Sequence, residues 1–98
     1  MLQVCIKDTS TIILNSISKN KNLEELNTYI DNSNCSNMTV DITSLNIIDA
    51  STIATLGSTM HYIKYPDGAI NWIVNSYKVK EYTTPMNLGN SKFIYKKQ

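Results

Sequence analysis

The spacing of apolar residues along the first third of the chain predicts two strands followed by a helix. Residues 2–6 alternate apolar and polar side chains, as in a half-buried strand, and residues 11–14 form a second strand-like run. The turn-forming residues 8–10 between them predict an antiparallel hairpin. A helix is then expected over residues 22–31, with Asn22 as its N-cap. Its expected apolar stripe is Leu23, Leu26 and Ile30.

The rest of the chain continues this alternation. A helix is expected to open at Asp49, and a shorter one over residues 77–83 ends before Pro85, whose ring cannot continue a helix. Trp72 is large enough to anchor helices against the sheet. The predicted strands are residues 38–42, 70–74 and 91–96. The expected core-facing stripe of the longer helix is Ile53, Leu56, Met60 and Ile63.

The element order is therefore β-β-α-β-α-β-α-β. Strands separated by helices favour parallel pairing, and the first hairpin is the antiparallel exception. We expect an α/β fold with a mixed, mostly parallel sheet of about five strands and helices packed mainly on one face. The 98 residues provide material for a single domain, 1–98.

Composition and charge narrow the classes of partner. Nine Lys and Arg residues against eight Asp and Glu give a net charge of +1, whereas nucleic-acid binders usually carry a basic face. The N-terminal residues lack the cationic flank, long apolar run and small-residue cleavage site of a signal peptide, and the apolar runs are too short to cross a bilayer. We therefore expect a cytoplasmic protein with no direct membrane insertion, and reduced thiols at Cys5 and Cys35.

Residues for catalysis or metal binding are sparse. The carboxylates are scattered, no phosphate-binding glycine loop or nucleophile motif is present, and the two cysteines lack zinc-site spacing. The only histidine, His61, is expected to be a partly exposed helix residue. The sequence thus predicts a protein that is not an enzyme and uses no cofactor or metal.

One segment, residues 38–57, resembles the central signature of STAS domains, the family of bacterial anti-sigma factor antagonists and sulfate-transporter tails. That signature is a strand ending in Asp, a turn with Leu, two apolar residues, and then Asp-Ser-Ser-Gly-Leu at a helix start. Asp41 and Leu45 fall in register, and the run Ile47-Ile48-Asp49-Ala50-Ser51-Thr52-Ile53 stands in place of the second half. The order of elements along the chain is similar to the family as well.

The resemblance implies a phosphorylation switch, and the chain departs from it. In the family a serine directly after the Asp is phosphorylated by an ATPase-type kinase, and its position here holds Ala50. Ser51 and Thr52 follow as candidate phosphoacceptors, and Asp49 and Asp41 as partner-binding residues. The alternative role for Asp49 and Ser51 is helix capping, which requires the same position at a helix start as a phosphoacceptor does.

By resemblance, the expected function is a protein-binding regulatory module of bacterial signalling and transcription regulation. It would dock on an anti-sigma factor or ATPase-type serine kinase through the start of the second helix. One alternative is a structural STAS subunit of a membrane transport complex, which Ala50 fits better. Another is a scaffold that uses its exposed first strand.

Four tyrosines have two possible roles. They either cover the sheet and helices or anchor a protein partner: Tyr62, Tyr65, Tyr77 and Tyr82.

Overall fold

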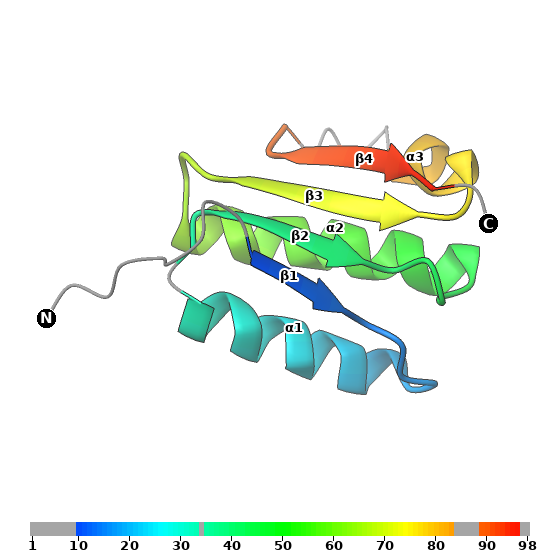
Figure 1. Ribbon diagram of the computed structural model, residues 1–98, viewed down its shortest axis with the longest axis horizontal. Helices are drawn as coiled ribbons and strands as arrows, with labels where there is room; N and C mark the ends of the chain where they lie inside the picture. Colours follow the sequence, from blue (N-terminus) through cyan, green and yellow to red (C-terminus); the bar gives the residue numbers. More distant parts are fainter. Residues whose placement is uncertain (1–9, 34, 84–88, 97–98) are drawn as a thin grey trace, which may run out of the picture.

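The computed structural model describes residues 10–33, 35–83 and 89–96, which form an α/β fold with one four-stranded sheet and three helices. Along the chain the elements are β1 Ser10–Ile13, α1 Lys19–Ser33, β2 Asn37–Asp41, α2 Ile47–Lys64, β3 Ala69–Val74, α3 Tyr77–Thr83 and β4 Ser91–Tyr95. The strands lie in the order β1-β2-β3-β4, and each is parallel to its neighbours (Figure 1). A helix connects each strand to the next, as parallel pairing requires.

The α/β class predicted from the sequence is confirmed, and the sheet differs from expectation in two ways. The described residues contribute four strands rather than about five, and all of them are parallel rather than mixed. Both differences concern the expected strand 2–6 and its antiparallel hairpin, which lie outside the described residues. None of the described helices combines the length and apolar character needed to cross a bilayer.

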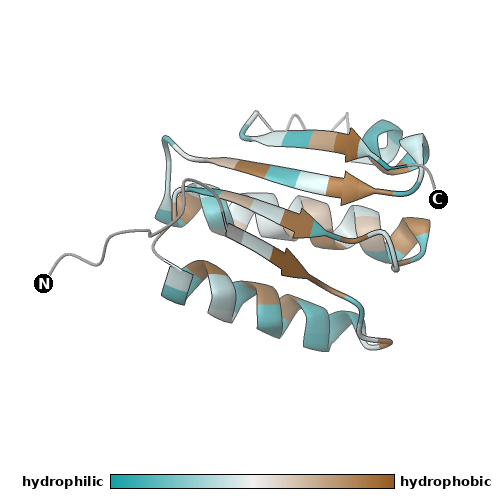
Figure 2. Ribbon diagram, in the orientation of Figure 1, coloured by the Kyte–Doolittle hydropathy of each residue, from teal (hydrophilic) through white to brown (hydrophobic). Residues whose placement is uncertain are grey.

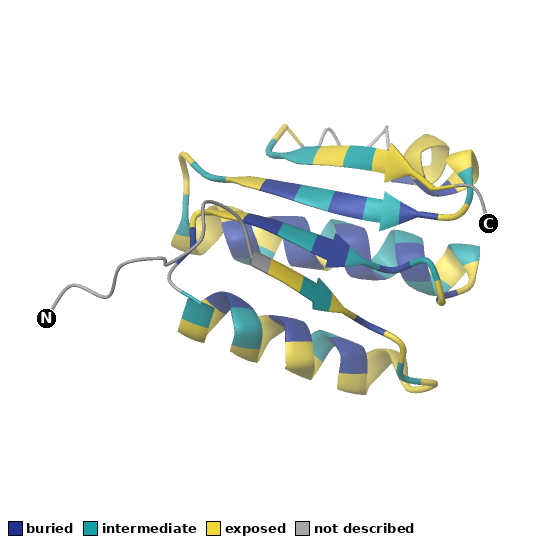
Figure 3. Cartoon of the chain, viewed as in Figure 1, coloured by how far each residue is buried: buried dark blue, intermediate teal, exposed yellow. Residues whose placement is uncertain are grey.

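The core lies between one face of the sheet and the helices. Alternate residues of the two central strands are buried: Met38 and Val40 in β2, and Ile70, Trp72 and Val74 in β3. Figure 1 shows α2 behind these strands, and α1 and α3 contact it from either side. In Figure 3 the buried residues of α1 and α2 form stripes, while much of the α1 surface is exposed. Trp72 is fully buried, which confirms it as the anchor.

Small residues, Gly57 and Ser58, stand where the inner face of α2 meets Trp72. Gly57 faces Trp72 so closely that an added Cβ would lie 2.6 Å from the indole Cη2 and 2.6 Å from Leu26 Cδ2. The buried residues of this helix are Ala50, Ile53, Ala54, Gly57, Ser58 and His61. Of the expected stripe, only Ile53 is fully buried.

Leu56 and Ile63 were expected in the core, and that expectation is wrong. Their side chains are 44% and 75% exposed, and Met60 is half-buried. The physical reason is the close approach of α2 to the sheet. Trp72 fills the space beneath the helix, so the side chains that meet it must be small. The large apolar side chains are left on the outer side.

The start of α1 lies earlier than the sequence indicated. The backbone N–H of Lys21 donates to the Ser18 hydroxyl at 3.3 Å, so Ser18 has the role expected of Asn22. Asn22 is buried instead, and its side-chain amide donates to the carbonyl of Ser16 and accepts from the N–H of Ser16, both at 3.0 Å. This pair of bonds fixes the β1–α1 connection to the helix. Leu26 and Ile30 are buried as predicted.

Cys35 is 5% exposed and disulfide-bonded. The reduced thiol expected from the sequence is therefore wrong for this residue. The chain's other cysteine, Cys5, lies outside the described residues. Local sequence pattern does not show which thiols the fold brings together.

Candidate protein-docking surface at the start of α2

The N-terminus of α2 is closed by a reciprocal cap. The side-chain oxygen of Asn46 accepts from the backbone N–H of Asp49 at 2.8 Å, and its amide donates to Asp49 Oδ2 at 3.2 Å. The helix therefore begins at Ile47, with Asn46 as the N-cap, rather than at Asp49 as predicted. Asp49 sits in the first turn, where its negative charge interacts favourably with the helix dipole. Asn46, rather than Asp49, therefore caps the helix, and Asp49 holds the side chain of that cap.

The three residues that follow Asp49 point in different directions. Ala50 is 1% exposed and belongs to the core, so the position of the family's phosphoserine is buried and lacks a hydroxyl. The Ser51 hydroxyl donates to the Ile47 carbonyl at 2.7 Å, and the Thr52 hydroxyl donates to the Ile48 carbonyl at 3.0 Å. Neither hydroxyl caps the helix, and both residues are half-buried beside the solvent.

Asp41 is placed at the end of β2, where its carboxylate holds the turn that leads to α2. Its Oδ1 accepts from the backbone N–H of Thr43 at 3.0 Å and from the Thr43 hydroxyl at 2.7 Å. The side-chain amide of Asn75 in turn donates to the Thr43 carbonyl. The β2–α2 connection is therefore tied both to its own strand and to the segment after β3. Asp41 stabilises the platform from which α2 begins.

Three exposed apolar residues surround this end of the molecule. Ile17 in the β1–α1 connection is 101% exposed, Ile48 at the second position of α2 is 67% exposed, and Tyr77 at the start of α3 is 63% exposed. Each follows the carboxyl end of a strand, and parallel strands present their carboxyl ends at one edge of the sheet. Figure 2 shows hydrophobic residues gathered at the forward ends of the strands. We call Ile17, Ile48 and Tyr77 the carboxyl-edge patch.

Sequence reasoning singled out Tyr77 and missed the other two. Ile17 lies between two serines in a polar connection, and a large apolar residue in such a setting was the signal available. Tyr77 also stacks on Tyr95, with ring centroids 4.3 Å apart. Of the other tyrosines, Tyr62 and Tyr82 are 56% and 51% exposed, while Tyr65 packs against the core. Three of the four tyrosines are therefore exposed, and Tyr65 covers the core.

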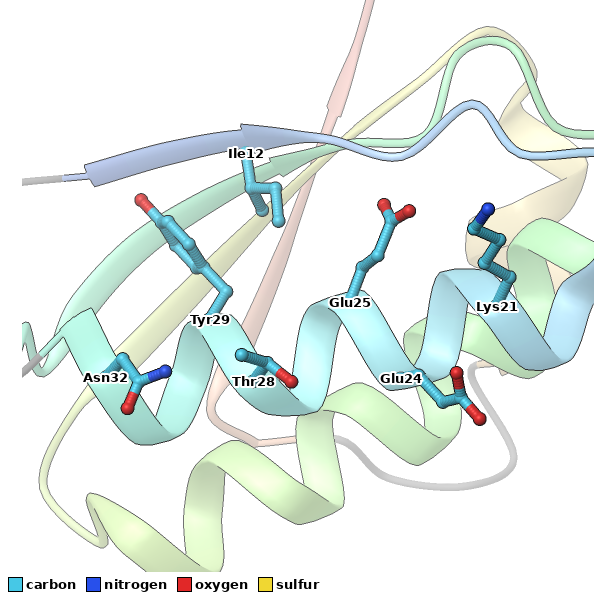
Figure 4. Close-up of a pocket in the computed structure, with 7 residues that line it drawn as sticks. All are labelled: Ile12, Lys21, Glu24, Glu25, Thr28, Tyr29 and Asn32. Atoms are coloured by element: carbon cyan, nitrogen blue, oxygen red, sulfur yellow. The ribbon is translucent and has the colours of Figure 1, made fainter.

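Two grooves flank the helices. One, with a volume of about 280 Å³, runs between α2 and α3 and is lined by Ser51, Thr52, Thr55, Leu56 and Tyr82. The other, of about 550 Å³, lies between strand β1 and α1. In Figure 4, Tyr29 leans towards Ile12 at one end of this groove, and Glu25 and Lys21 stand at the other. The lining of this second groove also includes Glu24, Thr28 and Asn32.

His61 is buried rather than partly exposed as expected. Its side chain is 0% exposed, and within the described part of the chain only the backbone of Ser36 approaches the ring as a polar neighbour, without forming a well-aligned hydrogen bond. Burial lowers the pKa of His61 below the ordinary histidine value, and the backbone of Ser36 offsets part of that change. The sequence missed this burial because small neighbours, not an apolar stripe, define the inner face. Among the residues that the structure describes, no three His, Cys, Asp or Glu side chains come together as a metal site.

Comparison of the chain with protein-family models, with curated proteins and with solved structures finds no match.

Proposed function

We propose that this chain is a protein-binding regulatory module with a STAS-like architecture, which docks on its partner through the start of α2 and the neighbouring connections. The observation that carries the proposal is the carboxyl-edge patch. Large apolar side chains exposed together on rigid connections are typical of interaction surfaces, because a partner gains free energy by removing them from water. Ile17 lies in the β1–α1 connection, whereas Ile48 and Tyr77 lie at the starts of α2 and α3, and each follows the carboxyl end of a different strand.

The hydrogen bonds beneath this surface support the proposal. Asn46 and Asp49 hold the start of α2, Asp41 and Thr43 hold the turn before it, and Asn75 joins that turn to the next connection. A preorganised surface loses little conformational freedom on binding, so more of the contact energy remains as affinity. By resemblance, the partner is an anti-sigma factor or a related ATPase-type serine kinase in the cytoplasm of a bacterium.

Phosphorylation would fall on Ser51 or Thr52 rather than on Ala50. A phosphate on either hydroxyl would lie in the first two turns of α2, where negative charge is favoured. The hydroxyl would first have to leave its bond to the Ile47 or Ile48 carbonyl. That added charge beside Ile48 would disfavour an apolar partner by desolvation. Such a modification would therefore release the partner.

A capture experiment tests the docking surface. Tagged protein is incubated with extract of the source cells, and bound proteins and the phosphorylation of the bait are identified by mass spectrometry. We expect the wild-type chain to retain an ATPase-type kinase or anti-sigma factor, and Ile17→Asn to lose it. Ile63→Asn is the matched control, because Ile63 is also an exposed isoleucine, 75% exposed, but lies in the last turn of α2, at the other end of that helix from Ile48. Equal retention by both variants would contradict docking at the carboxyl-edge patch.

The burial of Ala50 favours a second candidate, a structural STAS subunit of a membrane transport complex that has no phosphorylation cycle. A core position without a hydroxyl offers no site for the family's switch. The same capture experiment separates the two functions. Capture of transporter subunits by an unphosphorylated bait would establish the structural subunit. Capture of a kinase, with phosphate on Ser51 or Thr52 of the bait, would establish the regulatory module.

A further inference from the structure

The outer face of α2 lacks charge over most of its length. No Asp, Glu, Lys or Arg occurs between Asp49 and Lys64, although this helix has α1 and α3 beside it and the sheet beneath, leaving one side open to solvent. At 100° per residue, that open side carries the ridge Ile48, Thr52, Thr55, Thr59 and Ile63, with Leu56 beside it. Ile48, Leu56 and Ile63 are 67%, 44% and 75% exposed.

The hydroxyl groups on this ridge are already satisfied by their own helix. Thr52, Thr55 and Thr59 donate to the carbonyls four residues earlier, at 3.0, 2.9 and 3.1 Å. Burying a hydroxyl is costly mainly when its hydrogen bond is lost. Because these bonds survive inside the helix, the ridge presents methyl groups that can be removed from water at small cost. The surface thus suits close packing against another helix.

The ridge is also symmetric along the helix. Counting outward from the midpoint between Thr55 and Leu56, threonines occur at 52 and 59 and isoleucines at 48 and 63. An antiparallel copy of the same helix would therefore place threonine against threonine and isoleucine against isoleucine. Such self-matching is the property that a two-fold interface requires.

Charge supports the antiparallel direction. Asp49 lies in the first turn of α2, and Lys64, which also pairs with Asp31 of α1 at 3.9 Å, lies in its last turn. In an antiparallel pair the first turn of one helix lies beside the last turn of the other, and the two helix dipoles oppose each other. The uncharged middle allows close approach without burying an ion.

We propose that α2 forms a two-fold symmetric homodimer, in which the ridge Ile48, Thr52, Thr55, Thr59 and Ile63 packs antiparallel against the same ridge of a second copy. This interface adjoins the carboxyl-edge patch, where we place partner docking, and shares Ile48 with it. Ile48 lies where the two surfaces meet, so neither test uses a variant at that position.

The mass of the chain in solution tests the dimer. By light scattering after gel filtration at about 100 µM, we expect twice the chain mass of 11.1 kDa. Thr59→Arg should raise the dissociation constant on the order of 100-fold, because symmetry puts the unpaired charge into the interface twice. Thr28→Arg is the matched control, since Thr28 is also exposed on a helix, α1. Circular dichroism checks that both variants fold.

Cross-linking tests the direction. A Thr55→Cys variant lies next to the two-fold axis and should form a covalent dimer on mild oxidation. Positions 52 of the two copies would be separated by seven residues along the axis, about 10 Å, which is too far for a disulfide. Thr52→Cys should therefore not cross-link to itself, whereas a mixture of Thr52→Cys and Thr59→Cys should. Each variant retains Cys35 in its disulfide.

Three outcomes would overturn the proposal. They are a monomeric mass for the wild-type chain at about 100 µM, a dimer that is unaffected by Thr59→Arg, and self-cross-linking of Thr52→Cys, which would indicate parallel helices. None of these outcomes bears on the capture experiment, because Thr59→Arg leaves Ile17 and Tyr77 in place. The dimer and the docking surface can therefore fail independently.

Discussion

Helices α1 and α2 lie side by side on the same sheet, and they differ in the size of their inner residues and in the charge of their outer residues. The inner side of α1 uses large residues, Leu26 and Ile30, and its outer side is charged, with exposed Lys19, Lys21, Glu24, Glu25 and Asp31. The inner side of α2 uses four small residues beside Ile53 and His61, and its outer side holds exposed Leu56 and Ile63 without a charge. An α1-like helix is solvated on one side and buried on the other. The α2 pattern is typical of a helix that packs on the sheet with one side and against another helix with the other, as in the homodimer proposed above.

The largest effect is expected where α2 meets the sheet. Gly57→Val should lower the free energy of unfolding by about 3 kcal/mol or more, because its Cβ alone would come within 2.6 Å of both Trp72 and Leu26. Urea denaturation followed by tryptophan fluorescence measures the change, since Trp72 is the chain's only tryptophan. Gly89→Val is the control, because a Cβ there meets nothing within 4 Å. Equal losses at the two glycines would refute close contact between α2 and the sheet.

The second effect concerns His61, the titratable residue on the inner side of α2. Its pKa is lowered in the folded chain by burial, so below about 6.5 the unfolded chain binds more protons than the folded one. The stability that the neutral His61 ring contributes is complete above the pKa that histidine has in the unfolded chain. The free energy of unfolding therefore falls as the pH drops below about 6.5. The slope should reach at most about 1.4 kcal/mol per pH unit.

Nuclear magnetic resonance checks this directly, because His61 is the only histidine and its ring protons can be assigned without ambiguity. We expect its titration midpoint to lie below that of histidine in a peptide. A midpoint at or above about 6.5 would show that the ring is solvated or paired with an acid, contrary to its burial.

The third prediction compares how much the N-caps of α1 and α2 contribute to stability. Asn46→Ala should cost about 1 kcal/mol, because it removes the bonds to both the N–H and the carboxylate of Asp49. Ser18→Ala at the start of α1 should cost less, since the bond to the Lys21 N–H is longer, 3.3 Å. Denaturation curves of the two variants, with exposed Asn27→Ala as a control, test the order. The reverse order would mean that the start of α2 is the looser of the two.

The smallest effect is expected on the outer side of α2. Ile63→Lys should change the free energy of unfolding by about 0.5 kcal/mol or less when measured at low micromolar concentration, because the side chain is 75% exposed. Ile53→Lys, at a position that is 0% exposed on the same helix, should abolish folding. A large loss of unfolding free energy for Ile63→Lys would mean that Ile63 lies in the core, as the sequence suggested. The contrast between α1 and α2 would then not hold.

Local pattern was enough to predict most elements of this fold. The described strands and all three helices fall close to the segments predicted by their periodicity, and Trp72, Leu26 and Ile30 are buried as expected. These features depend on residues near in sequence, so a single chain carries the signal. Helix starts were less certain, because Ser18, Asn22, Asn46 and Asp49 are all good capping residues, and only the geometry shows which of them bonds to a free N–H.

The sequence by itself also determined the absence of charge on α2, the symmetric spacing of its threonines and isoleucines, and the alanine at position 50. Only the tertiary structure decided which side of that helix faces the sheet. Periodicity weighs large apolar residues most heavily, so it placed Leu56 and Ile63 inside. Trp72 occupies the space beneath the helix, and only Ala, Gly and Ser fit against it. Packing therefore turned the larger residues outward and buried His61, because it depends on volumes contributed by distant parts of the chain.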